Sequence, residues 1–167
     1  MTRNGGRLVG APTQINVKTK AQDKIPDVGE AAPKVATDTL ESLKGKKDLL
    51  DTRKPPSDMH ADFATVVGKK PVALLFSTPQ LCVSRVCGPV TDLALQMRAK
   101  YGEKMEFIHQ EVWKDNDLKA GVRAPLAAFN LESEPWLFVI DKRGKVTARL
   151  EGSFGTTAFE NAIKTGL

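Results

Sequence analysis

The sequence lacks the long apolar segments that mark membrane-spanning chains and secretory precursors. Its apolar runs, such as Val72–Phe76, fall far short of the ~20 residues that cross a bilayer. The first residues begin with charge, as a signal peptide does, but lack the apolar stretch that must follow. We therefore expect no membrane span, and either a cytosolic protein or a chain from which a signal or lipid anchor has been removed.

Aromatic residues are also scarce, at 6% of 167 residues, and none lies in the basic clusters Lys44–Lys47 and Gly68–Lys70. Nucleic-acid-binding modules gather basic residues on one face and interleave them with aromatic side chains. The net charge of +5 is modest, and its excess lies in residues 1–70, which carry 13 Lys and Arg against 9 Asp and Glu. We expect the basic clusters to be solvated surface, and no nucleic-acid partner.

Large apolar side chains are few in residues 1–27, so this segment cannot offset its own ordering entropy and is predicted to be a flexible tail. The remaining residues, 28–167, are numerous enough to bury one sizeable core and are predicted to form a single domain. Residues 28–40 have the proline and small side chains of an extended, edge-like segment. Residues 46–60 are predicted to be a loop, because Pro55 and Pro56 forbid helix locally.

From Met59 onward the apolar pattern alternates between strands and helices. Strands are predicted at residues 71–77, 104–113, 135–141 and 145–152. Helices are predicted at residues 61–68, 89–101 and 156–167, with a helical or mixed connection at 117–131. A crossover helix between the first two strands favours parallel pairing, and a hairpin turn at 141–144 favours an antiparallel edge. The sequence therefore predicts an α/β fold with a mixed central sheet flanked by helices.

Both cysteines lie in "LCVSRVC", residues 81–87, between a predicted buried strand and the helix that follows it. An open α/β sheet usually places its chemistry at such a junction. Pro89 suits a first helical turn, which puts Cys87 beside the helix N-terminus, where a partial positive charge would lower the pKa of its thiol. Within one regular helix the two Cα atoms would lie about 8 to 9 Å apart, beyond the roughly 7 Å limit for a disulfide. We therefore expect Cys82 on the loop before the helix.

The short separation also limits what the pair can contribute to stability. A bridge that closes so short a loop contributes about 2 kcal/mol, against nearly 5 for a loop of 100 residues. A structural staple is therefore disfavoured. A redox pair and two unbridged core thiols both remain open, and two cysteines do not decide the cellular compartment.

Three stretches resemble the thioredoxin superfamily. The stretch "PVALLFSTPQLCVSRVCGPV" resembles its strand, active-site loop and helix start, and "FNLESEPWLFVIDKRGKV" resembles its cis-proline, strand, turn and strand. "LEGSFGTTAFENAIKTGL" resembles the closing helix. The resemblance covers roughly residues 28–167 and implies a thioredoxin-like three-layer sandwich. It implies that Pro135 is a cis-proline that turns the preceding backbone toward the cysteines, where a peptide could pair with it. "VGEAAP" resembles the opening of redoxin domains, many of them extracytoplasmic, which favours that location over the cytoplasm.

The sequence departs from the family pattern around the cysteines. Their spacing is C-x4-C and not C-x2-C, Leu81 stands in place of the usual aromatic residue, and Val90 in place of the second cysteine of "CGPC". Leu75 occupies the strand position where thioredoxins carry a buried acid for proton transfer. Glu134, just before Pro135, is a candidate replacement proton carrier, with a solvated carboxylate as the alternative.

The first functional hypothesis is a thiol-disulfide oxidoreductase that acts on protein thiols and disulfides, with an unidentified electron donor and no cofactor. One cysteine attacks a substrate disulfide as a thiolate and the other resolves the mixed disulfide. The resemblance assigns the attack to Cys82, whereas the helix-dipole argument favours Cys87, so the order stays open. The candidate catalytic residues are Cys82, Cys87, Glu134 and Pro135, and we expect a monomer.

Three further hypotheses come from the same part of the chain. C-x4-C after Thr78-Pro79 resembles the motif of some peroxiredoxins, and this resemblance implies a thiol peroxidase with Arg85 or Arg123 as the activating arginine. A Sco-like copper carrier would use Cys82, Cys87 and His109, because thiolate and imidazole ligands suit copper. A redox-inactive binding module could use Trp113 and Trp136 as exposed anchors, although core packing is the other interpretation of these residues.

Overall fold

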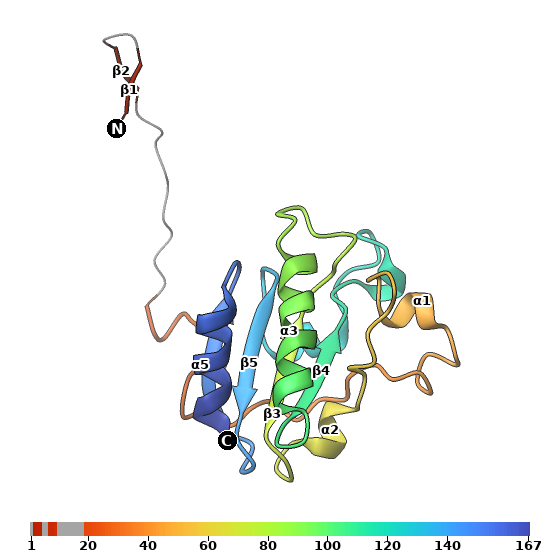
Figure 1. Ribbon diagram of the computed structural model, residues 1–167. Helices are drawn as coiled ribbons and strands as arrows, with labels where there is room; N and C mark the ends of the chain where they lie inside the picture. Colours follow the sequence, from red (N-terminus) through yellow and green to blue (C-terminus); the bar gives the residue numbers. More distant parts are fainter. Residues whose placement is uncertain (1, 5–6, 10–18) are drawn as a thin grey trace.

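A mixed four-stranded sheet forms the centre of the computed structural model, which describes residues 2–4, 7–9 and 19–167 (Figure 1). β3 (Val72–Phe76) pairs in parallel with β4 (Glu106–Gln110) and antiparallel with β5 (Trp136–Ile140). β6 (Val146–Glu151) pairs antiparallel with β5, so the strand order is β4-β3-β5-β6. The mixed α/β sheet predicted from the sequence is confirmed.

Two longer helices cover one face of this sheet, as Figure 1 shows. α3 (Cys87–Tyr101) is the crossover between β3 and β4, and α5 (Thr156–Gly166) ends the chain. The opposite face packs against the short helices α2 (Phe63–Val66) and α4 (Ala124–Ala128) and the aromatic residues around them. The arrangement is therefore the predicted three-layer sandwich.

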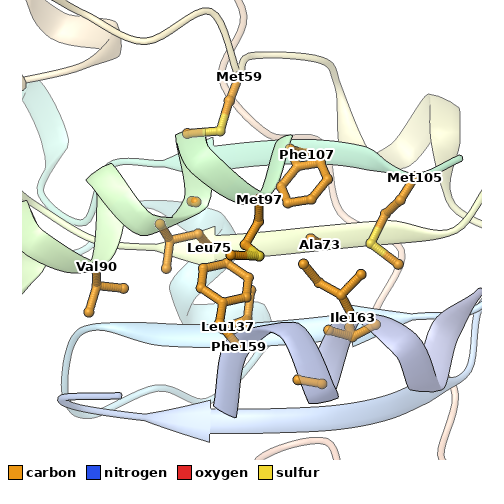
Figure 2. Packing of buried hydrophobic residues seen from close by; sticks show 13 residues of the cluster. Met59, Ala73, Leu75, Val90, Met97, Met105, Phe107, Leu137, Phe159 and Ile163 are labelled. Atoms are coloured by element: carbon orange, nitrogen blue, oxygen red, sulfur yellow. The ribbon is translucent and has the colours of Figure 1, made fainter. Parts of the chain in front are cut away.

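β3 is buried on both faces, which explains its continuous apolar sequence. Its alternate residues Ala73 and Leu75 point into the cluster beneath α3 and α5, together with Met97, Phe107 and Phe159 (Figure 2). Its other residues, Val72, Leu74 and Phe76, enter the second cluster on the opposite face. The cysteine loop that follows β3 is therefore anchored on a fixed central strand.

The connecting segments differ most from their predicted form. The segment predicted to be a loop contains a short helix, α1 (Lys47–Leu50). This helix can form because it ends before Pro55 and Pro56. η1 (Lys114–Asn116) precedes the predicted mixed connection. Residues 28–40 form no named strand and make a single bridge, from Ala31 to Lys145 at the sheet edge. α3 begins at Cys87, two residues before the start that Pro89 suggested.

Much of the predicted N-terminal tail lies outside the described residues. Its described part contains β1 (Thr2–Asn4) and β2 (Arg7–Val9), paired antiparallel. Nearer the domain, Arg149 of β6 donates to an Asp23 carboxylate oxygen at 2.9 Å and to the Ile25 carbonyl oxygen at 3.2 Å. These contacts hold the last part of the segment against the sheet, and the border between tail and domain stays a prediction.

Candidate functional site

Two consecutive turns carry the chain from β3 to α3 and set the position of Cys82. The Leu81 amide donates to the Thr78 carbonyl oxygen, and the Arg85 amide donates to the Cys82 carbonyl oxygen, both at 3.2 Å. Arg85 has φ of 59°, a left-handed conformation that non-glycine residues rarely adopt. This reversal of the chain leads to α3, whose first residue is Cys87. Cys82 lies on the loop before the helix, as predicted.

Both thiols are free, and each affects the pKa of the other. Cys87 is fully buried, Cys82 is 9% exposed, and the neighbouring Val83 is 90% exposed. Burial opposes ionisation of Cys82. Hydrogen bonds from Cys87, from the Ser84 hydroxyl at 3.2 Å and from the Val86 and Cys87 backbone amides outweigh it and lower the pKa of the Cys82 thiol.

Cys87 shows the opposite behaviour. Its burial, its hydrogen bond with Cys82 and the nearby Glu134 charge raise its pKa, against the lowering effect of a backbone hydrogen bond from Thr78. The sequence argument that gave Cys87 the lowered pKa is therefore wrong. The helix starts at Cys87 itself, and the Val86 and Cys87 backbone amides at this start lower the pKa of Cys82 instead.

Glu134 and Pro135 come directly before β5, and the Glu134 charge acts on Cys87. The Glu134–Pro135 peptide bond is cis, and the Pro135 carbonyl oxygen accepts a hydrogen bond from the Gly152 amide at 2.8 Å. Glu134 is half-buried, and burial raises the pKa of its carboxyl group. The structure thus brings together Cys82, Cys87 and Glu134, three of the four predicted catalytic residues, beside the fourth, Pro135.

His109 lies away from the cysteines. It pairs in register with Leu75, which is fully buried where the family carries an acid. Its Nε2 lies 3.1 Å from the Ser77 carbonyl oxygen, and its Nδ1 faces Asp51 at 3.4 Å. Within residues 19–167, His109 gathers with Asp51 and Glu111 and with neither cysteine. The copper hypothesis built on Cys82, Cys87 and His109 therefore lacks its third ligand.

The arginine and tryptophan candidates differ in how far they are engaged in structural contacts. Arg123 is buried and donates to Asp38 and to the Trp113 carbonyl oxygen, so its guanidinium holds loops together. Arg85 is exposed on the cysteine loop. Trp136 is 6% exposed and stacks on Phe138, so it is not an exposed anchor.

Sequence reasoning missed the buried polar residues next to this site. Asp51, Glu111 and the Ser77–Thr91 hydroxyl pair are all buried, and the two hydroxyls lie 2.8 Å apart. The signal that could have found them is "FIHQEVW", where His109 and Glu111 interrupt an apolar strand at alternate positions. A buried polar group needs a partner, so these residues indicated a second polar cluster.

Comparison with solved structures shows the thioredoxin-like fold. A putative thiol:disulfide interchange protein DsbE from Chlorobium tepidum is 19% identical, with 84% of this chain and 98% of that chain covered and a TM-score of 0.57. A thioredoxin family thiol:disulfide interchange protein from Chlorobium tepidum TLS is also 19% identical, with coverages of 81% and 94% and a TM-score of 0.55. MTB dsbF is 14% identical, with coverages of 81% and 97% and a TM-score of 0.55.

The resemblance to the thioredoxin superfamily is thereby confirmed for the fold. No protein-family description matches the sequence, and no curated protein is similar enough to match it. No helix in the described part of the chain combines the length and the apolar character needed to cross a membrane.

Proposed function

We propose that this protein is a thiol-disulfide oxidoreductase that uses Cys82 and Cys87 on protein substrates. The observation that carries the proposal is the asymmetry of the pair, in which a lowered pKa at Cys82 stands next to a raised pKa at Cys87. A thiol that ionises more readily than its partner can attack as the thiolate, while a partner that stays protonated is kept for the resolving step of disulfide exchange. The thiol:disulfide interchange proteins that share the fold support it.

The reaction begins with attack of the Cys82 thiolate on one sulfur of a substrate disulfide. A mixed disulfide forms, and the other substrate sulfur leaves as a thiolate that takes up a proton. Cys87 then loses its proton and attacks the Cys82 sulfur, which releases the second substrate thiol and leaves a Cys82–Cys87 disulfide. Two electrons have passed to the substrate, and a dithiol donor returns the pair to its reduced form.

Glu134 is the proposed acceptor of the Cys87 proton. Its charge acts on Cys87, and burial raises the pKa of its carboxyl group, so a proton can pass between groups of closer acidity. Leu75 leaves the family's usual acid position without a carboxylate. The backbone before Pro135 is the proposed place for a bound peptide.

The test is a thiol count by mass spectrometry across a series of redox buffers, on the wild type, Cys82→Ser and Cys87→Ser. A reversible intramolecular disulfide in the wild type, with reduction of a model protein disulfide, supports the proposal. Two thiols that stay reduced at every biological potential would overturn it.

We further propose an extracytoplasmic, monomeric protein. The resemblance of "VGEAAP" to redoxin domains supports the location. Cell fractionation of the full-length protein tests it, and recovery in the cytoplasmic fraction alone contradicts it. Sedimentation of the purified chain tests the oligomeric state.

A further inference from the structure

A second group of buried polar side chains lies beside β4, where the segment of residues 51–60 runs along the strand. The Met59 carbonyl oxygen accepts a hydrogen bond from the His109 amide at 2.7 Å, which fixes this segment to the strand edge. Asp51, His109 and Glu111 are each at most 1% exposed. Each offers one potential ligand atom, and the three atoms lie within 4.8 Å of one another.

The hydrogen bonds around His109 determine which ring nitrogen faces this group. Its Nε2 lies 3.1 Å from the Ser77 carbonyl oxygen, which can only accept, so Nε2 carries a hydrogen. In the neutral ring the lone pair is then on Nδ1. This atom is buried, has no hydrogen-bond partner, and lies 3.4 Å from the Asp51 carboxylate oxygen Oδ2. Two acceptors thus face each other.

Glu111 adds a third acceptor to the same group. Its Oε1 accepts from the Thr52 amide at 2.7 Å and from the Thr52 hydroxyl at 2.6 Å, which orients the carboxylate. Its Oε2 is buried and has no donor. Asp51 Oδ2, in contrast, accepts from the Ser57 amide at 2.6 Å while it faces His109 Nδ1. Two buried carboxylates this close to each other are costly unless a cation lies among them.

A proton and a metal ion are the two candidate cations. Burial opposes a proton on His109, but the contact with Asp51 and the Glu111 charge outweigh it and raise the His109 pKa. The distance favours the metal ion. Hydrogen bonds between charged groups measure about 2.7 to 2.9 Å, whereas two ligand atoms about 2.1 Å from a tetrahedral metal ion lie about 3.4 Å apart. The Nδ1 to Oδ2 distance is 3.4 Å.

We propose that Asp51, His109 and Glu111 form a binding site for one divalent transition-metal ion. The hydrogen bond from His109 Nε2 to a backbone carbonyl and the two donors on Glu111 Oε1 are the outer contacts that commonly orient metal ligands. One imidazole and two carboxylates suit Zn²⁺ and Mn²⁺ better than the soft ions that thiolates select.

A route to the site runs past His60. This residue lines a surface cavity of about 510 Å³ together with Leu50 and Ser57, and its ring centroid lies 6.0 Å from that of His109. Its Nε2 lies 3.7 Å from the Asp51 carboxylate oxygen Oδ2. His60 therefore connects this cavity to Asp51, one of the proposed ligands.

The experiment uses the full chain with Cys82→Ser and Cys87→Ser, so that no thiolate can bind metal and the result does not depend on the redox proposal. The protein is stripped with chelator, and Zn²⁺, Mn²⁺ or Co²⁺ is added during calorimetry. We expect saturable binding of one ion per chain. Adding Glu111→Gln, which preserves side-chain shape, weakens binding at least about 10-fold. Glu41→Gln, at an exposed carboxylate, leaves the affinity unchanged.

NMR of the same double-serine protein locates the ion without any change to the cluster. We expect Zn²⁺ to shift the His109 ring signals and Mn²⁺ to broaden them. Absence of one-to-one binding for all three ions would overturn the proposal, and would assign the proton as the occupant. Binding that leaves the His109 signals unmoved, or that survives Glu111→Gln at full strength, would also overturn it.

Discussion

Two buried polar sites lie on either side of the peptide group between Ser77 and Thr78, and they have opposite hydrogen-bonding character. At the cysteine site, N–H, O–H and S–H donors converge on the Cys82 sulfur. At the cluster of Asp51, His109 and Glu111, acceptor atoms converge on one another. The first arrangement stabilises an anion and the second a cation. The comparison shows that hydrogen-bond polarity, more than burial, decides which charge each site favours.

Removing the Cys82 thiolate should have the largest effect on activity. Cys82→Ser should lower disulfide reduction by several orders of magnitude, because Cys87 is fully buried and protonated and cannot replace the nucleophile. An assay with a model protein disulfide measures this. Cys87→Ser is the matched control, and it should trap a mixed disulfide that mass spectrometry detects. A mixed disulfide that forms on Cys87 in Cys82→Ser as readily as on Cys82 in Cys87→Ser would show that the thiols do not differ as described.

Removing a carboxylate from the acceptor cluster should reduce stability strongly. Asp51→Asn should lower the free energy of unfolding by about 3 to 5 kcal/mol, because a buried ionic partner is lost. In addition, the new side-chain NH2 group would face one of the two backbone amides, of Arg53 or of Ser57, that now donate to the carboxylate at 2.7 and 2.6 Å. Urea unfolding measures the change.

The matched control for that variant is Asp48→Asn, since the side chain of Asp48 is 89% exposed and pairs with Lys54 at the surface. Its loss should cost no more than about 1 kcal/mol. Equal effects from the two substitutions would mean that the buried cluster contributes nothing special.

The pH dependence of alkylation should separate the two cysteines. Because its pKa is lowered, Cys82 should become thiolate, and react with iodoacetamide, at a pH below the value of about 8.5 for a free cysteine. Cys87, with a raised pKa, should react only at much higher pH or after unfolding. Mass spectrometry of the labelled peptides at each pH gives both profiles. A Cys82 midpoint above that of free cysteine would contradict this account.

The smallest expected effect comes from a single donor. Ser84→Ala removes the hydroxyl 3.2 Å from the Cys82 sulfur and should raise the alkylation midpoint by less than about one pH unit, since one hydrogen bond contributes about 1 kcal/mol. Val83→Ala, at the exposed neighbour, serves as the control and should leave the midpoint unchanged. A downward shift in Ser84→Ala would show that the hydroxyl is not a donor to the sulfur.

The sequence predicted what depends on local pattern. The apolar run of β3, the turn before β6 and the periodicity of α5 determine the order of strands and helices, and the loop placement of Cys82 followed from helix geometry. The sequence could not tell which sulfur the first amides of α3 face. That direction depends on the start of the helix at Cys87 and on the left-handed conformation of Arg85.

The acceptor cluster was missed for a different reason. Asp51 lies far from His109 and Glu111 in the chain, and it reaches them only because residues 51–60 fold along β4. α1 was also not predicted. The prolines at 55 and 56 exclude helix only from the residues beside them and not from the whole segment. The alternation of His109 and Glu111 indicates a polar cluster, but no local pattern shows that Asp51 is the residue that joins it.

The peptide group between Ser77 and Thr78 has a mechanical consequence. Its carbonyl oxygen accepts from His109, and its amide is the backbone group that lowers the pKa of Cys87. Because a peptide group is planar, these two groups cannot be reoriented separately. The group therefore couples β4 to the start of α3, because a rotation of this peptide plane would change its contact with His109 and its contact with Cys87 together.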